Sequence, residues 1–198
     1  MEKKIEYISG SGLFIEGLTC GNIKEIDKYR RVKTLTLRKV KGEAIDFVRL
    51  FPLLQDIRMY SCKFDDYSAL SEQGNLTSLF INTIKTVQEM NFEFVGNISN
   101  LKQLGIGYVS TFKKFPDLSN LINLQELKLF NCKNLEDITN ITLIPNLQSL
   151  DIVCTPQLPN DLKFIMQKKG MVKMNAAFGS KKLDNEFDSL LMQYKLRR

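Results

Sequence analysis

The chain has 198 residues, of which 43% are hydrophobic and 25% are charged, so its composition is that of a folded domain and excludes a disordered segment. It contains no histidine, which excludes Ser-His-Asp and Cys-His nucleophilic sites and histidine-ligated metals. The formal net charge is +6, but residues 163–198 hold nine Lys or Arg and three Asp or Glu, while the preceding residues hold 19 of each sign. The basic excess therefore belongs to the C-terminal end.

The N-terminal residues 1–12 are polar with scattered apolar positions, so they lack the apolar run of a signal peptide. No later stretch approaches the roughly 18 apolar residues that a membrane-spanning helix needs. The four cysteines lack the CxxC pairs of zinc sites and are too sparse for a disulfide-bonded scaffold; they are Cys20, Cys62, Cys132 and Cys154. If Met1 is the native start, we expect a cytoplasmic protein with reduced thiols.

Along the chain, apolar residues recur with the pattern LxxLxLxx(N/C)xL. The clearest units are residues 53–64 (LLQDIRMYSCKF), 124–135 (LQELKLFNCKNL) and 147–158 (LQSLDIVCTPQL). We call the second leucine of the pattern the anchor; the anchors are Leu13, Leu35, Ile57, Leu79, Leu104, Leu127, Leu150 and, more weakly, Val172. Their spacing of 22 to 25 residues resembles that of leucine-rich repeats, which is about 20–29. The repeat style resembles the 22-residue class of the internalins and of phosphatase-regulatory proteins.

In each repeat the anchor and the residue two positions later point to the same side of a short strand, so both are expected to face inward. Stacked repeats bury each other's apolar faces. This predicts an α/β solenoid of the leucine-rich repeat class: a curved parallel sheet of about seven to eight short strands on the concave face, an irregular or short-helical convex side, and a C-terminal helical cap. Five positions after the anchor the family expects Asn or Cys, but here that column is largely apolar. Cys62 and Cys132 fit it as buried thiols.

The positions one and three residues after each anchor should point outward onto the concave sheet. They carry large aromatic and basic side chains, a composition typical of the hot spots of protein interfaces. With one neighbour four positions after an anchor, these residues are Phe14, Arg38, Arg58, Tyr60, Phe80, Tyr108, Lys128 and Phe130. The alternative is that the aromatics only stabilise the strands. Gly105 and Gly107 should leave a bare patch that admits a protruding side chain of a partner. The alternative is that the two glycines reflect sequence drift without a function.

The period changes near the C-terminus. Residues 159–169 (PNDLKFIMQKK) predict a short helix. An amphipathic helix should follow, with apolar residues at Leu183, Phe187, Leu190, Leu191 and Tyr194. We expect it to seal the last repeat, and residues 5–8 (IEYI) to cover the first as a short strand. The predicted organisation is a solenoid over residues 1–160, with a degenerate repeat and helical cap over residues 161–198 as part of the same domain.

Together these patterns predict a module that binds another protein with acidic and apolar surface, such as an inhibitor, an immunity protein or a regulatory subunit. We expect the chain to be neither an enzyme nor a cofactor-binding protein, because its sequence contains no evident carboxylate pair, nucleotide-binding loop or metal-ligand cluster. The alternative is an anionic ligand, nucleic acid or a membrane surface, bound by the basic C-terminal end. A solvated cap is the simpler interpretation of that charge.

Overall fold

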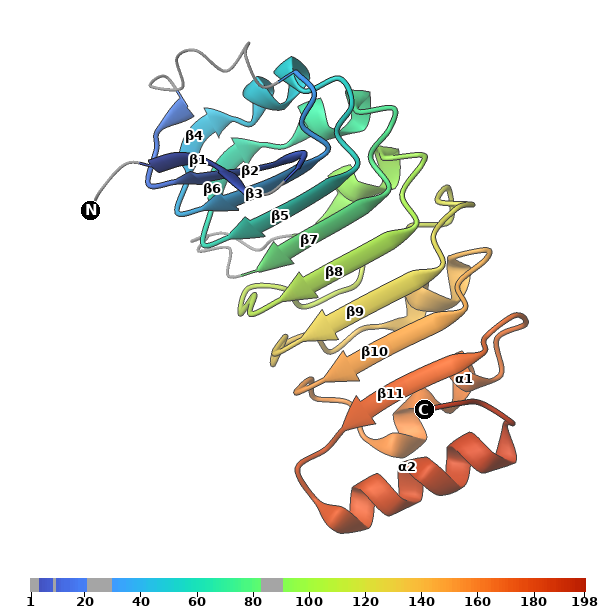
Figure 1. Cartoon of the computed structure of the whole chain (residues 1–198). Helices are drawn as coiled ribbons and strands as arrows, with labels where there is room; N and C mark the ends of the chain where they lie inside the picture. The colour runs from blue at the N-terminus through green and yellow to red at the C-terminus, as the bar shows by residue number, and fades with distance from the viewer. Residues whose placement is uncertain (1–3, 9, 21–29, 83–90) are drawn as a thin grey trace.

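The computed structural model describes residues 4–8, 10–20, 30–82 and 91–198. They form a solenoid whose strands lie side by side in one curved sheet, with helix α2 (Lys181–Gln193) at its C-terminal end (Figure 1). The sheet has nine strands, which are, in spatial order, β1 (Lys4–Ile8), β2 (Gly12–Glu16), β3 (Thr34–Arg38), β5 (Asp56–Tyr60), β7 (Ser78–Asn82), β8 (Gln103–Gly107), β9 (Glu126–Phe130), β10 (Ser149–Val153) and β11 (Lys173–Ala177). From β2 onward neighbouring strands are parallel, as the repeat predicts, whereas β1 covers β2 in the antiparallel direction.

The register of the sheet joins equivalent positions of successive repeats. Leu104 pairs with Leu127, and Leu127 with Leu150, so each anchor lies beside the next. These three side chains are at most 1% exposed, as are the inward residues two positions later in most repeats. A short strand can bury only one of its faces against the rest of its own repeat, and stacking encloses that face between neighbours. The inward leucine column predicted from the sequence is therefore confirmed.

The last repeat has a different anchor from the one predicted. Leu150 pairs with Met174, which is fully buried, while Val172 lies before β11 and is 39% exposed. The predicted anchor was wrong because Val172 and Met174 also stand two positions apart, as an inward pair would. The return segment before β11 contains helix α1 (Lys163–Met166), and it places the anchor 24 residues after Leu150. Asn175 and Ala177 are consequently the outward residues that follow this anchor.

Six strands of the large sheet, β2, β3, β5, β8, β9 and β10, are followed by a residue in the left-handed backbone region, four positions after the anchor. The φ angles there lie between 51° and 69°, at Gly17, Lys39, Ser61, Tyr108, Asn131 and Cys154. The turn continues the backbone ladder, since Asn131 N–H donates to the Val153 carbonyl at 2.9 Å. The next residue then points into the core; Cys62 and Cys132 occupy this position, at most 1% exposed. Their thiols donate to the carbonyls of Tyr60 and Phe130, at 3.6 and 3.5 Å.

A ladder of asparagines lies at a position that the sequence pattern did not identify, four residues before the anchor. Each side-chain Nδ2 donates to a backbone carbonyl of the preceding repeat: Asn75 to Pro52, Asn100 to Gly74, Asn123 to Ser99 and Asn146 to Ile122, at 2.7 to 3.1 Å. These bonds satisfy carbonyls of the turns that lead into the strands. They supply the polar link between repeats that the apolar column five positions after the anchor cannot supply.

We expect Asn123→Ala to lower the free energy of unfolding by about 1 kcal/mol, the net contribution of one such hydrogen bond. Urea denaturation followed by circular dichroism measures the change. Asn97→Ala is the matched control, because the exposed Asn97 side chain makes no hydrogen bond to the residues that the structure describes. Equal midpoints for the two variants would show that the ladder adds no stability.

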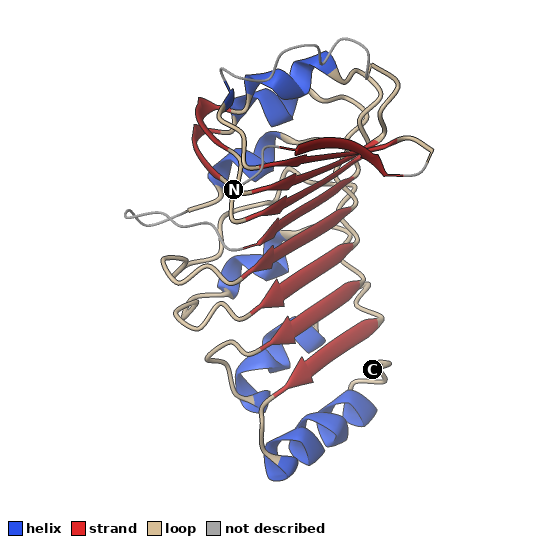
Figure 2. Ribbon diagram, turned by 60° about the vertical axis from the view of Figure 1, so that its left-hand side comes forward, coloured by secondary structure: helices blue, strands red, loops and turns tan. Residues whose placement is uncertain are grey.

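The convex side is built from short 3-10 helices: η3 (Asp46–Leu50), η4 (Ser68–Glu72), η5 (Glu93–Asn97), η6 (Thr139–Leu143) and η7 (Pro159–Leu162). A two-stranded sheet of β4 (Lys41–Ala44) and β6 (Lys63–Asp66) adds to it near the N-terminal end. Figure 2 shows the helical segments on one side of the sheet and α2 (Lys181–Gln193) below the last strand. Phe187, Leu190 and Leu191 of α2 are buried, which confirms the predicted amphipathic cap. The opposite side of the sheet is the concave face.

Candidate functional site

Three rows of outward side chains cross the concave face, at the positions one before, one after and three after each anchor. Over the four central strands β5, β7, β8 and β9, the first row is Asp56, Ser78, Gln103 and Glu126. The second row is Arg58, Phe80, Gly105 and Lys128. The third row is Tyr60, Asn82, Gly107 and Phe130. The parallel register places the members of each row on neighbouring strands.

Strands β5 and β9 carry the same chemical order of outward side chains. Each presents an acid, then a base, then an aromatic ring, and the two strands flank the uncharged residues of β7 and β8. We call them the two ribs; they consist of Asp56, Arg58 and Tyr60 on β5 and of Glu126, Lys128 and Phe130 on β9. At about 4.8 Å between neighbouring strands, they stand about 14 Å apart. The ribs therefore frame a strip two strands wide.

A hollow of about 350 Å³ lies between the ribs. We call it the central hollow, and its lining residues are Arg58, Tyr60, Ser78, Leu79, Phe80, Gln103, Leu104, Gly105, Glu126, Lys128 and Phe130. Five of the eight residues predicted for partner binding thus line one depression: Arg58, Tyr60, Phe80, Lys128 and Phe130.

Of the two glycines of β8, only Gly105 lines the central hollow, and it does not leave the floor bare. A Cβ atom at Gly105 would lie 2.3 Å from Cδ2 of Phe80, so the Phe80 ring already covers this position. At Gly107 a Cβ would lie 3.3 Å from Phe130 O, which is a tight contact, 3.5 Å from Phe130 Cβ and 3.8 Å from Asn82 Nδ2. Tyr60 packs on Phe80 with ring centroids 5.8 Å apart. Gly107 is buried and does not line the central hollow, so the two glycines do not leave the bare patch that the sequence predicted.

The charges of the two ribs are satisfied differently. Arg58 donates Nε and Nη2 to the two carboxylate oxygens of Asp56, at 3.2 and 3.0 Å. These hydrogen bonds raise the pKa of the Arg58 guanidinium. Lys128 makes no ion pair with any residue that the structure describes, although Glu126 lies two positions away on the same strand. The neighbour of Lys128 in the parallel register is Asp151 of β10, but no ion pair within the described residues fixes the Lys128 ammonium group.

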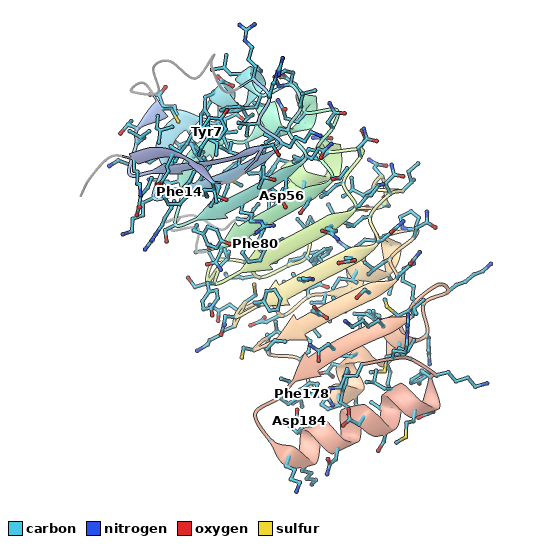
Figure 3. All side chains as sticks on the ribbon, viewed as in Figure 1. Tyr7, Phe14, Asp56, Phe80, Phe178 and Asp184 are labelled. Atoms are coloured by element: carbon cyan, nitrogen blue, oxygen red, sulfur yellow. The ribbon has the colours of Figure 1, made fainter. Side chains whose placement is uncertain are left out.

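The other three predicted residues lie outside the central hollow. Phe14 is on β2 and Arg38 on β3, where Arg38 pairs with Glu16 at 3.4 Å (Figure 3 labels Phe14, Asp56 and Phe80). Tyr108 is 54% exposed in the left-handed turn that ends β8, at the margin of the concave face. Asp56 and Glu126 were missed by the sequence reasoning, which left out the row one position before each anchor. Reading that column would have found both.

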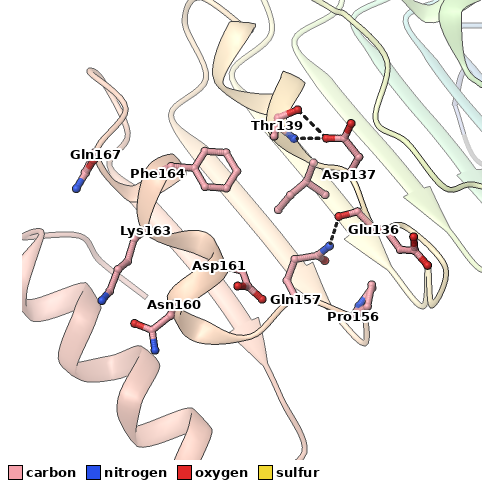
Figure 4. Close-up of a pocket in the computed structure, with 11 residues that line it drawn as sticks. Glu136, Asp137, Thr139, Pro156, Gln157, Asn160, Asp161, Lys163, Phe164 and Gln167 are labelled. Atoms are coloured by element: carbon pink, nitrogen blue, oxygen red, sulfur yellow. Dashed lines mark hydrogen bonds between the residues drawn. The ribbon is translucent and has the colours of Figure 1, made fainter.

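A second depression, of about 660 Å³, lies on the convex side between η6 and the segment formed by η7 and α1 (Figure 4). None of the predicted residues lines this convex groove. Several of its polar groups already bond to the protein itself. Asp137 accepts from Thr139, and Gln157 donates Nε2 to the Leu135 carbonyl at 2.7 Å. The convex groove is therefore a seam between the last regular repeat and the cap, not a match to the predicted site.

The basic residues of the C-terminal end do not gather on one face. Lys163 lines the convex groove, whereas Lys173 and Arg197 line a small hollow on the concave side of β9 to β11. Arg198 is held by Asp188 and lies over the Phe187 ring at 5.8 Å. These four basic residues therefore do not share one surface.

Burial raises the pKa of the Cys62 and Cys132 thiols to about 11, so both are protonated near neutral pH. Within the described ranges, no group of three or more Cys, Asp or Glu side chains is placed to hold a metal ion. None of the helices in the described part of the chain combines the length and apolarity that a membrane span requires.

The sequence matches no family model. Two proteins from Listeria monocytogenes with solved structures have a fold similar to that of this chain. The first is an internalin (inlF), with 16% identity and a TM-score of 0.53 over 89% of this chain; this chain spans 58% of inlF. The second is internalin C2 (inlC2), with 15% identity and a TM-score of 0.52 over 84% of this chain and 80% of inlC2. The repeat, the parallel sheet and these likenesses together assign the leucine-rich repeat fold to this chain.

Proposed function

We propose that the chain is a binding module that recognises another protein through its concave face, and that the central hollow is the core of the interface. The observation that carries the proposal is the convergence of three half-buried aromatic rings with Arg58 and Lys128 around one depression. Aromatic and arginine side chains contribute most of the affinity of protein interfaces when they surround a pocket that excludes water. A rigid sheet holds them in place, so little ordering is needed on association.

The proposal includes no catalytic step and no cofactor, and it places the protein in the cytoplasm. The thiols of Cys62 and Cys132 are buried and protonated, and Arg58, the one guanidinium in the central hollow, is held by Asp56. The side chains that line the central hollow supply contact area and orientation, which suits an inhibitor, an immunity protein or a regulatory subunit.

Site-specific photocross-linking in the native source tests this proposal. A benzophenone side chain in place of Phe80 should cross-link to a discrete partner protein, whereas the same group in place of Leu143, which is 45% exposed on the convex side, should not. Cross-links from the Leu143 position alone would refute the concave-face assignment. Recovery of nucleic acid from either position would support the alternative ligand instead.

A further inference from the structure

Gly105 is the central residue of strand β8, a place where glycine weakens a sheet. A glycine inside a strand has no side chain to pack, and it loses more conformational freedom on folding than any other residue. Only a positive φ would require glycine here, and Gly105 does not have one. The backbone conformation therefore does not explain why this position carries no side chain.

The side chain of Phe80 occupies the space above this glycine. The two residues are neighbours in the register of β7 and β8. A Cβ atom on Gly105 would lie 2.3 Å from Cδ2, 2.9 Å from Cε2 and 3.5 Å from Cγ of the Phe80 ring. Carbon atoms in contact stand about 3.5–4.0 Å apart, so this ring and a methyl group on residue 105 cannot occupy these places together. The ring also explains why Gly105 is buried although it lies on the outward face of β8.

The strand on the other side of Phe80, β5, confines the ring as well. Tyr60 packs on the Phe80 ring with centroids 5.8 Å apart and an angle of 52° between the two planes. Arg58, the register neighbour of Phe80 on β5, is itself held by two hydrogen bonds to Asp56. A ring that both neighbouring strands hold before binding loses little freedom when a partner arrives.

We propose that Gly105 is a positioning residue of the interface. By carrying no side chain it gives the Phe80 ring its seat, and it thereby fixes the aromatic part of the central hollow in the form that the partner meets. The inference rests on the proposed function, and Gly105 acts through Phe80 and not through contacts of its own. A methyl group at position 105 would displace the ring, whereas the strand would persist, because alanine suits a strand at least as well as glycine.

Nuclear magnetic resonance tests the seat in the free protein. The chain has 11 glycines, so protein labelled with ¹³C-glycine gives a simple spectrum, in which sequential assignment identifies Gly105. The ring current of Phe80 acts on the α-protons of Gly105. Phe80→Leu should therefore shift the Gly105 signals more than those of any other glycine. Unchanged Gly105 signals in this variant would overturn the inference.

A double-mutant cycle tests the consequence for binding, with the purified partner that is captured by cross-linking from position 80 as the probe. Gly105→Ala should weaken the affinity about ten-fold, the effect of misplacing an interface anchor. In the Phe80→Ala background the same substitution should change the affinity by less than about two-fold, because no ring is left to displace. Calorimetry measures the four dissociation constants.

Gly96→Ala is the matched control for the added methyl group. A Cβ atom on Gly96, in η5 on the convex side, would lie 3.6 Å from Asp117 O and 3.7 Å from Leu118 Cδ2, which are ordinary contacts. This variant should bind the partner as wild type does. Thermal melts establish that the variants fold, and the Phe80→Leu spectrum keeps the test decisive if Gly105→Ala does not.

Wild-type affinity of Gly105→Ala, or an equal loss with and without the Phe80 ring, would overturn the inference. In both cases a partner that cross-links from position 80 would still support the proposed function. Cross-linking from position 143 alone would remove the proposed function itself, and with it the role of Gly105 in binding.

Discussion

Leu127→Asp is expected to unfold at least the central repeats of the solenoid. Leu127 is fully buried between Leu104 and Leu150, so an aspartate there would lie inside the core without a partner. Losing the leucine alone costs about 2–5 kcal/mol, and burying an unpaired charge costs more, against a total stability of about 5–15 kcal/mol. Far-UV circular dichroism during a thermal melt would show an early transition or no folded baseline.

The matched control for Leu127→Asp is Lys128→Asp, which places the same side chain one position later on the outward face. Its cost should not exceed about 1 kcal/mol, the span of strand preferences. Because repeats contact only their neighbours, Leu127→Asp should also separate the melt into an unfolded centre and a residually folded end. A single cooperative transition at the wild-type temperature would contradict the inward placement of Leu127.

The repeat could be predicted from the sequence because burial imposes it directly. Every inward position must be apolar for a repeat to stack, and that requirement leaves a visible period in the chain. The end of the solenoid is different, since only one neighbour constrains it. There Val172 and Met174 both satisfy the local pattern, and only the pairing of Met174 with Leu150 distinguishes them. The asparagine ladder was not predicted, because its hydrogen bonds go to backbone carbonyls. Every residue type carries such a carbonyl, so the acceptors leave no pattern in the sequence.

Strand alternation predicted which residues lie on the concave face, but it did not predict the contacts that they make there. Alternation placed Arg58 and Lys128 outward equally; it could not tell that Asp56 holds Arg58 while Lys128 makes no ion pair in the part of the chain that the structure describes. Ring orientation was equally hidden, and it decides that Phe80 covers Gly105. These features depend on side-chain rotamers, which are set by packing against several residues on neighbouring strands. They set the chemistry of the central hollow even though its members were predictable.

For a partner captured by cross-linking from position 80, the double variant Tyr60→Ala/Phe130→Ala is expected to weaken the affinity about 100-fold. Each ring is half-buried at one rib of the central hollow and offers the apolar surface that hot spots use. Truncating one such anchor costs on the order of 1–2 kcal/mol, and about 1.4 kcal/mol corresponds to a ten-fold change in the dissociation constant. Calorimetry or surface plasmon resonance measures the loss.

The salt dependence and a convex-side control make this prediction specific. Leu158→Ala/Phe164→Ala removes two exposed apolar side chains, one immediately before η7 and one in α1, and should leave the affinity unchanged. The ratio of wild-type to Tyr60→Ala/Phe130→Ala affinity should stay constant between low and high salt, because apolar contacts are not screened. Most of the loss should be in the dissociation rate. Equal affinity of the wild type and this double variant would mean that the rings only stabilise their strands, and the binding surface would then lie elsewhere on the solenoid.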